Sequence, residues 1–392
     1  MVPRLLVLFL LRGSIYGSIV PFAAVLLIRA GLPPALVGPL AAAAAVTTLV
    51  CAPTWGRLGD RHGRRRMLVA AFLVGVPAAV GHATGLLPLL ALAYIAWAFA
   101  SAAFIPLADS LALARLGGSR SRYSRVRVGA SAGFIIAALT VGAAISFTGA
   151  GWVVPGIAGA VLCVAASSVV AVRLGGELRT GTGVATGATG GLLEGVRAGI
   201  ARHPGFMVGL VLVFAAANAP SIFTGPRVAE IGGSGWEIGL ATAAGTLVEV
   251  PAFLVLPWLL PIVGGRRLFV VAGLLLAVSG VLAAIAPTPA LLIAARLLFG
   301  AGFAWMVIPS LGAISSAAPP DGQAAAAALH FASSAAGSLL VALLGLPLVG
   351  LTGSVSAVLI AAALAAPIGA VVALRGWPAN RSARPGPAGA PA

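Results

Sequence analysis

The feature that most constrains this sequence is a series of twelve long apolar segments, separated by short connectors that carry most of the charge. An α-helix needs about 20 consecutive apolar residues to cross the hydrocarbon core of a bilayer. A single soluble core could not bury this composition, in which 60% of residues are hydrophobic and 8% are charged. We therefore predict an all-α membrane protein with twelve transmembrane helices. The predicted spans are 4–28, 33–54, 67–87, 88–113, 126–148, 152–173, 205–228, 236–261, 267–286, 289–317, 323–346 and 351–375.

The arginines indicate how the spans cross the membrane. The net charge is +16, and the chain contains no lysine. If the N-terminus lies in the cytoplasm, twenty of the 24 arginines fall on the cytoplasmic side, in agreement with the positive-inside rule. We expect both termini in the cytoplasm of a bacterial cell and the chain in its cytoplasmic membrane, in contact with lipid. Nucleic acid is not an expected partner, because its recognition needs a soluble basic face.

The chain divides into two halves that resemble each other weakly. At an offset near 201 residues, Gly63 in the first half aligns with Gly264 in the second. The longest connector lies between the halves; its first part resembles a flexible linker, and its second part could form an amphipathic helix. Two repeated six-helix bundles around a central site are typical of transporters. The predicted regions are an N-terminal bundle (1–173), a cytoplasmic linker (174–204), a C-terminal bundle (205–375) and a cytoplasmic tail without fixed structure (376–392).

The connector after the second span reads GRLGDRHGRRRML and starts at Gly56. It resembles the G-x-L-x-D-R-x-G-R-[KR] signature between helices 2 and 3 of the major facilitator superfamily. This resemblance implies a transporter in which helices 3, 6, 9 and 12 lie outside the others. Residues 106–134 and 238–253 resemble the lactose permease-like and phenylpropionate permease-like symporters. The fifth span has no proline, unlike many drug/proton antiporters, and this difference favours uptake by symport.

The resemblance also implies a cytoplasmic gate. In the family, the acid of the signature packs against the start of helix 11, here around Gln323, and so links the two halves. Asp109, near the inner end of the fourth span, is placed to pair with Arg61 or Arg65. The alternative is a solvated loop whose charge pairs contribute about 0–1 kcal/mol each. The expected gate residues are Gly56, Asp60, Arg61, Gly63, Arg64, Arg65 and Asp109.

Ionisable groups inside spans are energetically costly, so each is a candidate functional residue. Glu249 lies about halfway along span 236–261 and shares a helix face with Thr242 and Thr246. A carboxyl group removed from water tends to retain its proton, and renewed contact with water or the approach of an arginine favours its release. Glu249 is therefore our candidate proton carrier. The alternative is a permanently neutral acid that hydrogen-bonds a neighbouring helix.

Two arginines also lie inside predicted spans. Arg296 begins RLLFGAG, which resembles the R-x-x-x-G pattern that the family more often carries in helix 4, where the arginine serves proton coupling. Arg296 could instead extend to the outer surface. Arg12 could bind an anionic group, pair with Glu249 or extend to the inner surface. We expect proton coupling at Glu249 and Arg296.

Polar and aromatic side chains in several spans predict a central cavity. A lone histidine or an aromatic stripe is more often structural, and that alternative applies to part of this set. The sequence predicts neither a metal site nor a cofactor. The expected cavity residues are Arg12, Tyr16, Tyr94, Trp97, Asn218, Thr246 and His330.

These features predict a secondary transporter that couples a small organic solute to protons by alternating access and works as a monomer. Two cations near the cavity favour an anionic substrate such as a carboxylate. A proton-driven exporter is the first alternative, since it differs only in direction. A polytopic membrane enzyme would need clustered acids or histidines, whereas the three Asp, five Glu and four His are scattered. Without lysine, the chain cannot form the G-x-x-x-x-G-K-[ST] motif of an ATP-driven pump.

Overall fold

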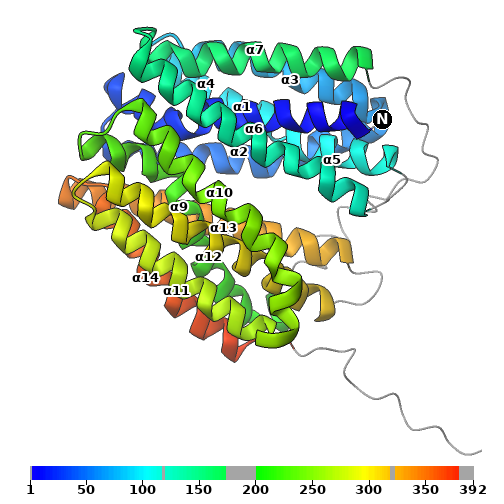
Figure 1. Ribbon diagram of the computed structural model, residues 1–392, viewed down its shortest axis with the longest axis vertical. Coiled ribbons are helices and arrows are strands. Elements are labelled where there is room, and N and C mark those ends of the chain that lie inside the picture. Colours follow the sequence, from blue (N-terminus) through cyan, green and yellow to red (C-terminus); the bar gives the residue numbers. More distant parts are fainter. Residues whose placement is uncertain (1, 117–119, 174–199, 318–322, 379–392) are drawn as a thin grey trace, which may run out of the picture.

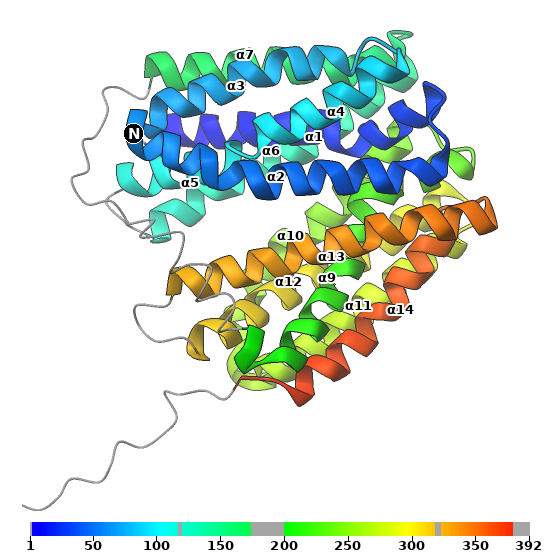
Figure 2. The same ribbon diagram turned by 180° about the vertical axis from the view of Figure 1, so that it is seen from behind.

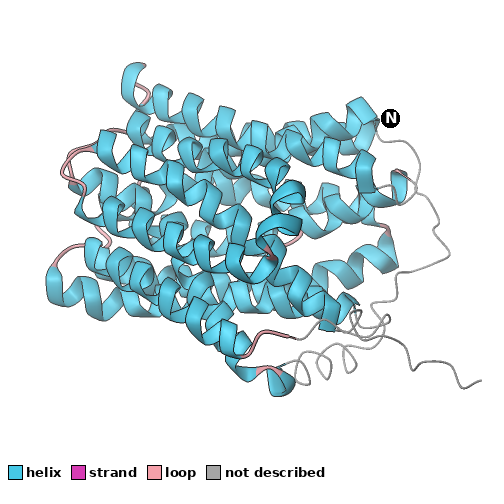
Figure 3. Cartoon of the chain, turned by 60° about the horizontal axis from the view of Figure 1, so that its bottom comes forward, coloured by secondary structure: helices cyan, strands magenta, loops and turns pink. Residues whose placement is uncertain are grey.

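The computed structural model describes residues 2–116, 120–173, 200–317 and 323–378. Within these ranges the chain is helical and has no β-strand, which confirms the predicted fold class (Figure 3). The linker at 174–199 and the tail from residue 379 onwards lie outside the described residues. The first half contains α1 (Val2–Arg29), α2 (Pro34–His62), α3 (Arg64–Gly81), α4 (Leu87–Ser101), α5 (Phe104–Arg115), α6 (Arg120–Phe147), η1 (Gly151–Val153), α7 (Val154–Ser168) and η2 (Val169–Arg173). The second half contains α9 (Pro204–Glu230), α10 (Gly235–Val263), α11 (Gly265–Ile285), α12 (Pro289–Ala317), α13 (Gln323–Thr352) and α14 (Ser356–Arg375).

These helices account for twelve membrane crossings. In the described part of the chain, eleven segments are long and apolar enough to span a bilayer. The remaining crossing is α3, which has 18 residues and begins with three arginines. It packs along α7 and α4, so we count it as the third crossing of the first half.

The two halves form two bundles that lie side by side (Figures 1 and 2). Helix α6 packs against α10 and α2 packs against α13, while α1 contacts α9. Small residues allow the close approach: a side chain at Gly142 would collide with the backbone of Gly235. At the same end, the backbone N–H of Trp236 donates to Ser146 Oγ at 2.8 Å. The bundles are closest there and separate towards the end that carries the N-terminus.

The arginine-rich connector is mostly helical, and the second helix extends eight residues beyond the predicted end of the second span at residue 54. Helix α2 continues to His62, and α3 begins at Arg64. A helix can project beyond the hydrocarbon, so an apolar run sets its minimum length. Gly63 joins the two helices with φ 94°, and Gly264 joins α10 to α11 with φ 83°. The aligned glycines therefore make the same turn in both halves, where a side chain would be strained.

The fourth crossing is broken at residues 102–103, between α4 and α5. Pro106 has no N–H to donate, and its ring would clash with the carbonyl four residues earlier, at the break. Side chains from other helices donate to carbonyls beside it. Tyr16 Oη donates to Ser101 O at 3.0 Å, and Trp55 Nε1 donates to Phe99 O at 2.9 Å. The sequence predicted one uninterrupted span here.

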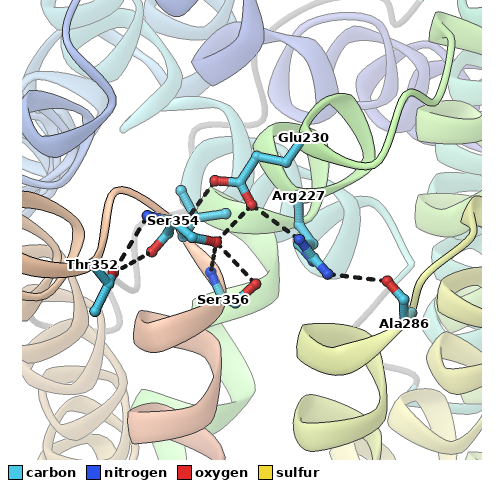
Figure 4. Close-up of polar contacts among 7 residues, drawn as sticks. Arg227, Glu230, Ala286, Thr352, Ser354 and Ser356 are labelled. Carbon is cyan, nitrogen blue, oxygen red and sulfur yellow. Dashed lines mark hydrogen bonds and ion pairs between the residues drawn. The ribbon is translucent and has the colours of Figure 1, made fainter.

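A polar cluster joins helix ends of the second bundle at the end away from the N-terminus (Figure 4). Glu230 accepts hydrogen bonds from the backbone N–H of Val355 at 2.8 Å and from Ser354 Oγ at 3.0 Å. Arg227 pairs with Glu230 at 3.2 Å and donates to Ala286 O at 3.0 Å. The cluster caps the start of α14 and the end of α11, and so stabilises this bundle as a unit.

Candidate functional site

Two pockets meet where the bundles face each other, and both include Val20 and Ser221 in their walls. The polar lobe has a volume of about 220 Å³, and the aromatic lobe about 180 Å³. The polar lobe is lined by Val20, Pro21, Phe134, Ala217, Asn218, Pro220, Ser221, Thr224, Gly225, Thr242, Thr246, Glu249, Arg296, Phe299 and Phe303. The aromatic lobe is lined by Tyr16, Ile19, Val20, Ala23, Ala24, Ala44, Ala45, Thr48, Tyr94, Trp97, Ala98, Ser101, Ser221 and Ile222.

Arg296 is the buried cation of the polar lobe, with 7% of its surface exposed. Its guanidinium lies 3.9 Å from the ring centre of Phe299, and its Nε donates to Ala241 O at 3.4 Å. A side chain at Gly245 would come within 3.1 Å of Nη2, so this glycine makes room for the guanidinium. Nη1 is buried and has no hydrogen-bond partner within the described residues. One donor of this buried cation is therefore unsatisfied in the described part of the chain.

Glu249 lies in the same lobe and interacts electrostatically with two arginines, Arg127 and Arg296. Arg296 belongs to α12, in the same bundle as Glu249, whereas Arg127 belongs to α6 in the other bundle. Thr242 and Thr246 line the lobe from the same face of α10. Their hydroxyls donate back to Ile238 O and Thr242 O along their own helix, so their remaining lone pairs can accept hydrogen bonds.

The first bundle holds a second charged cluster. Arg12 Nη1 lies 2.6 Å from Asp109 Oδ1, and Arg127 Nη1 lies 3.7 Å from Asp109 Oδ2. The Arg12 guanidinium also lies 4.3 Å from the ring centre of Phe9. Arg12 therefore forms an ion pair, as one of its alternatives predicted, but its partner is Asp109 rather than Glu249.

The expected pairing of Asp109 with Arg61 or Arg65 is wrong, because the acid faces Arg12 and Arg127 instead. Arg65 donates to the carbonyls of Val170 and Ala171 at the end of the sixth crossing. Sequence position alone could not show which of the arginines pairs with Asp109.

The other expected gate residues lie at the junction of α2 and α3. Asp60, near the end of α2, pairs at 3.1 Å with Arg64, the first residue of α3. Gly56 and Arg61 belong to the last turns of α2, and Gly63 forms the joint. The side chain of Gln323 lies outside the described residues, so the expected contact with Asp60 stays a prediction.

The expected aromatic residues line the aromatic lobe. Tyr16, Tyr94 and Trp97 come from α1 and α4, and their rings face the pocket together with Thr48. Trp97 packs edge to face against Phe104, with ring centres 5.8 Å apart. These rings therefore belong both to the wall of the cavity and to the packing of the first bundle.

Two further candidates differ in their positions. Asn218 lines the polar lobe, and its amide donates to Ser334 O at 2.9 Å. His330 is not in the lining of either lobe; its Nε2 lies 2.9 Å from Ser310 Oγ, and its ring packs edge to face against Phe214. Arg127 was not among the expected site residues, because it lies at the edge of the predicted span 126–148, whereas α6 begins seven residues earlier, at Arg120.

Two bundles that enclose a buried, charged cavity at their interface have the architecture of a transporter that alternates access to a central site. The sequence profile described as "MFS_1 like family" matches residues 4–348. The chain therefore belongs to the MFS_1 like family, and it is a multi-pass membrane protein with the major facilitator fold. This confirms the resemblance to the superfamily.

Individual relatives agree with this assignment. The chain is 29% identical over 277 residues to a maltose permease of Geobacillus stearothermophilus, a match that covers 66% of this chain and 65% of that protein, just under two thirds of its length. The fold is similar to that of the nucleoside transporter NupG, with a TM-score of 0.79, 14% identity and coverage of 95% and 97% of the two chains. For a D-xylose-proton symporter the TM-score is 0.71, with 16% identity and coverage of 96% and 98%.

Proposed function

We propose that the protein is a proton-coupled symporter in a bacterial cytoplasmic membrane, with Glu249 as its proton carrier. The observation that supports this is the position of Glu249, in the wall of the polar lobe together with Arg296. A carboxyl group in such a place can exchange its proton whenever water reaches the cavity. The protein would work as a monomer, since one chain contains both bundles and the cavity between them.

In the orientation that we infer from the arginines, the end with the N-terminus faces the cytoplasm. The bundles make close contacts at the opposite end, between α6 and α10 and between α2 and α13. We infer that this is the inward-facing state. Rocking of the bundles would then open the outer end, and the junction at Asp60 and Arg64 would restrain the inner end in the outward-facing state.

The test is proton movement in proteoliposomes that contain a pH-sensitive dye. The probes are maltose, D-xylose, uridine and phenylacetate, each added to wild type and to Glu249→Gln. Glu237→Gln is the matched control on the same helix, because glutamine preserves the capping box that Glu237 forms with Ser234. We expect a probe that moves together with protons in wild type and in the control. Glu249→Gln should retain exchange of that solute and lose proton movement.

Unchanged proton movement in Glu249→Gln would remove this residue from the mechanism, and solute entry without protons would exclude coupling altogether. The direction of transport is tested separately in everted vesicles. An exporter accumulates its solute there when the interior is acidified, whereas a symporter loses solute under the same gradient. Maltose is included because the maltose permease is a sequence relative, and D-xylose and uridine because of the similar folds.

A further inference from the structure

We infer that Arg296 binds the carboxylate of a monoanionic substrate, and that Glu249 competes with this carboxylate for the same guanidinium. The inference rests on the proposed function and names the class of substrate. The competition makes transport electroneutral, with one proton entering for each substrate anion.

The first step is the unused donor of Arg296. The residue Arg296 is 93% buried, because 7% of its surface is exposed, and its Nη1 lacks a hydrogen-bond partner among the described residues. A buried cationic donor without a partner is unfavourable, so a bound group with a negative oxygen would be stabilised there. The lobe that contains it also offers Asn218, Thr242 and Thr246 as polar neighbours. A substrate carboxylate would supply the negative charge and the acceptor atom that Nη1 lacks.

The second step is the balance of charge around the site. The charged groups that act electrostatically on Glu249 are Arg296 from α12, which lines the same lobe, and Arg127 from α6, while α9 contributes uncharged residues such as Asn218 and Thr224. Arg127 already lies 3.7 Å from Asp109. Arg296 therefore has two possible anionic partners, the ionised side chain of Glu249 and a substrate carboxylate.

These alternatives produce coupling. With Glu249 ionised and no substrate, Arg296 and Glu249 balance each other. With Glu249 protonated and a carboxylate bound, Arg296 and the substrate balance each other. The two remaining combinations leave one uncompensated charge in a closed cavity, which is unfavourable. The two states in which the bundles can rock therefore carry no net charge at Arg296 and its anionic partner, and the substrate enters together with one proton.

The third step is the shape of the cavity. The aromatic lobe joins the polar lobe at Val20 and Ser221, and its volume of about 180 Å³ is lined by Tyr16, Tyr94 and Trp97. A cavity of about 150 Å³ can hold a benzene ring. The geometry therefore fits a solute with its carboxylate against Arg296 and an apolar body of about one ring in the aromatic lobe.

The experiment uses the purified full-length protein in lipid nanodiscs. The probes are ω-phenylalkanoates from benzoate to phenylbutyrate, each compared with its neutral amide by isothermal titration at pH 6 and pH 8. We expect one chain length to bind best, and its acid to bind about ten- to a hundredfold more tightly than its amide. Acid binding should weaken from pH 6 to pH 8 in wild type and remain constant in Glu249→Gln. Arg296→Gln should lose the preference for the acid.

Equal binding of acid and amide in wild type would overturn the inference without any variant having to fold. No binding by any member of the series would overturn it as well, as would a preference for the acid that persists in Arg296→Gln. A different outcome would refute the proposed function: no solute, whatever its charge, would move together with protons. A neutral solute that moves with protons would refute the carboxylate site and leave proton coupling intact.

Electroneutrality has its own readout in proteoliposomes. A pH gradient should drive uptake of the best acid, whereas a potassium diffusion potential with valinomycin should leave its rate unchanged. A rate that follows the potential would contradict the exchange of one proton for one carboxylate charge.

Discussion

The ion pair between Arg12 and Asp109 gives a quantitative prediction, because only one of the two residues has a second partner of opposite charge within the described part of the chain. The atoms lie 2.6 Å apart, and the side chains are 5% and 21% exposed. Removal of one partner from a buried pair costs about 3–5 kcal/mol. Asp109→Asn leaves Arg12 without an acidic partner in the described part of the chain. Because Asp109 is partly exposed, we take the lower end, a loss of about 3 kcal/mol in the free energy of unfolding.

Arg12→Gln should be milder. Asp109 then keeps Arg127, which lies 3.7 Å away, so we expect a loss of about 1–2 kcal/mol. The double variant leaves neither charge of the pair behind and should be no less stable than Asp109→Asn alone. The difference from additivity, about 1–2 kcal/mol, measures the coupling between the two side chains.

The assay is the thermal unfolding midpoint in one detergent, followed by intrinsic tryptophan fluorescence. Asp60→Asn is the matched control, since Asp60 pairs with Arg64 at 3.1 Å in a more exposed position, where such pairs contribute about 0–1 kcal/mol. We expect the midpoint to fall most for Asp109→Asn, less for Arg12→Gln and least for the control. Equal losses for the two single variants, or strict additivity in the double variant, would refute the reasoning.

Three further predictions use the same assay. We expect Gly63→Ala and Gly264→Ala each to lower the free energy of unfolding by about 1–3 kcal/mol, because both glycines have a positive φ. Gly56→Ala is the control and should be neutral, since nothing lies within 4 Å of the added carbon. Tyr16→Phe should lower the free energy of unfolding by about 1 kcal/mol, because it removes the donor to Ser101 O. Tyr94→Phe loses no hydrogen bond within the described residues and should lower it less. Equal losses of stability would contradict a stabilising role for the Tyr16 hydrogen bond. Gly133→Val should lower the free energy of unfolding by about 1–3 kcal/mol, because its side chain would collide with the backbone of Leu10. Gly312→Val is the control, since the added side chain has open space. A Gly133→Val variant as stable as wild type would mean that α1 and α6 can separate freely.

The arrangement of helices could be predicted because it depends on local and repeated features. The run of apolar residues specifies each crossing, and the alignment of Gly63 with Gly264 corresponds to one turn used twice. The break in the fourth crossing was missed even though Pro106 is visible in the sequence. Prolines inside α1 and α9 leave those helices intact, so a proline alone does not reveal a break. The donors that stabilise the break come from α1 and α2, and they become apparent only in three dimensions.

The candidate site could be predicted where a residue type alone is informative. Glu249 and Arg296 are conspicuous because charges inside spans are costly, and both line the polar lobe. The partner of Asp109 could not be predicted, because several arginines lie within reach along the chain. Arg127 was overlooked since it is the second residue of the predicted span 126–148 and borders the arginine-rich connector, although α6 starts at Arg120. Pairing depends on helix rotation and helix length, neither of which hydropathy determines.

The distribution of these charges between the bundles indicates which interaction a rocking motion can alter. Arg12 and Asp109 belong to one bundle, and Arg296 and Glu249 to the other, so these separations persist when the bundles move as units. Arg127 and Glu249 lie on opposite bundles, and their separation must change. We therefore expect the affinity of Glu249 for a proton to depend on the conformation. By thermodynamic reciprocity, protonation of Glu249 must shift the balance between the conformations by the same free energy.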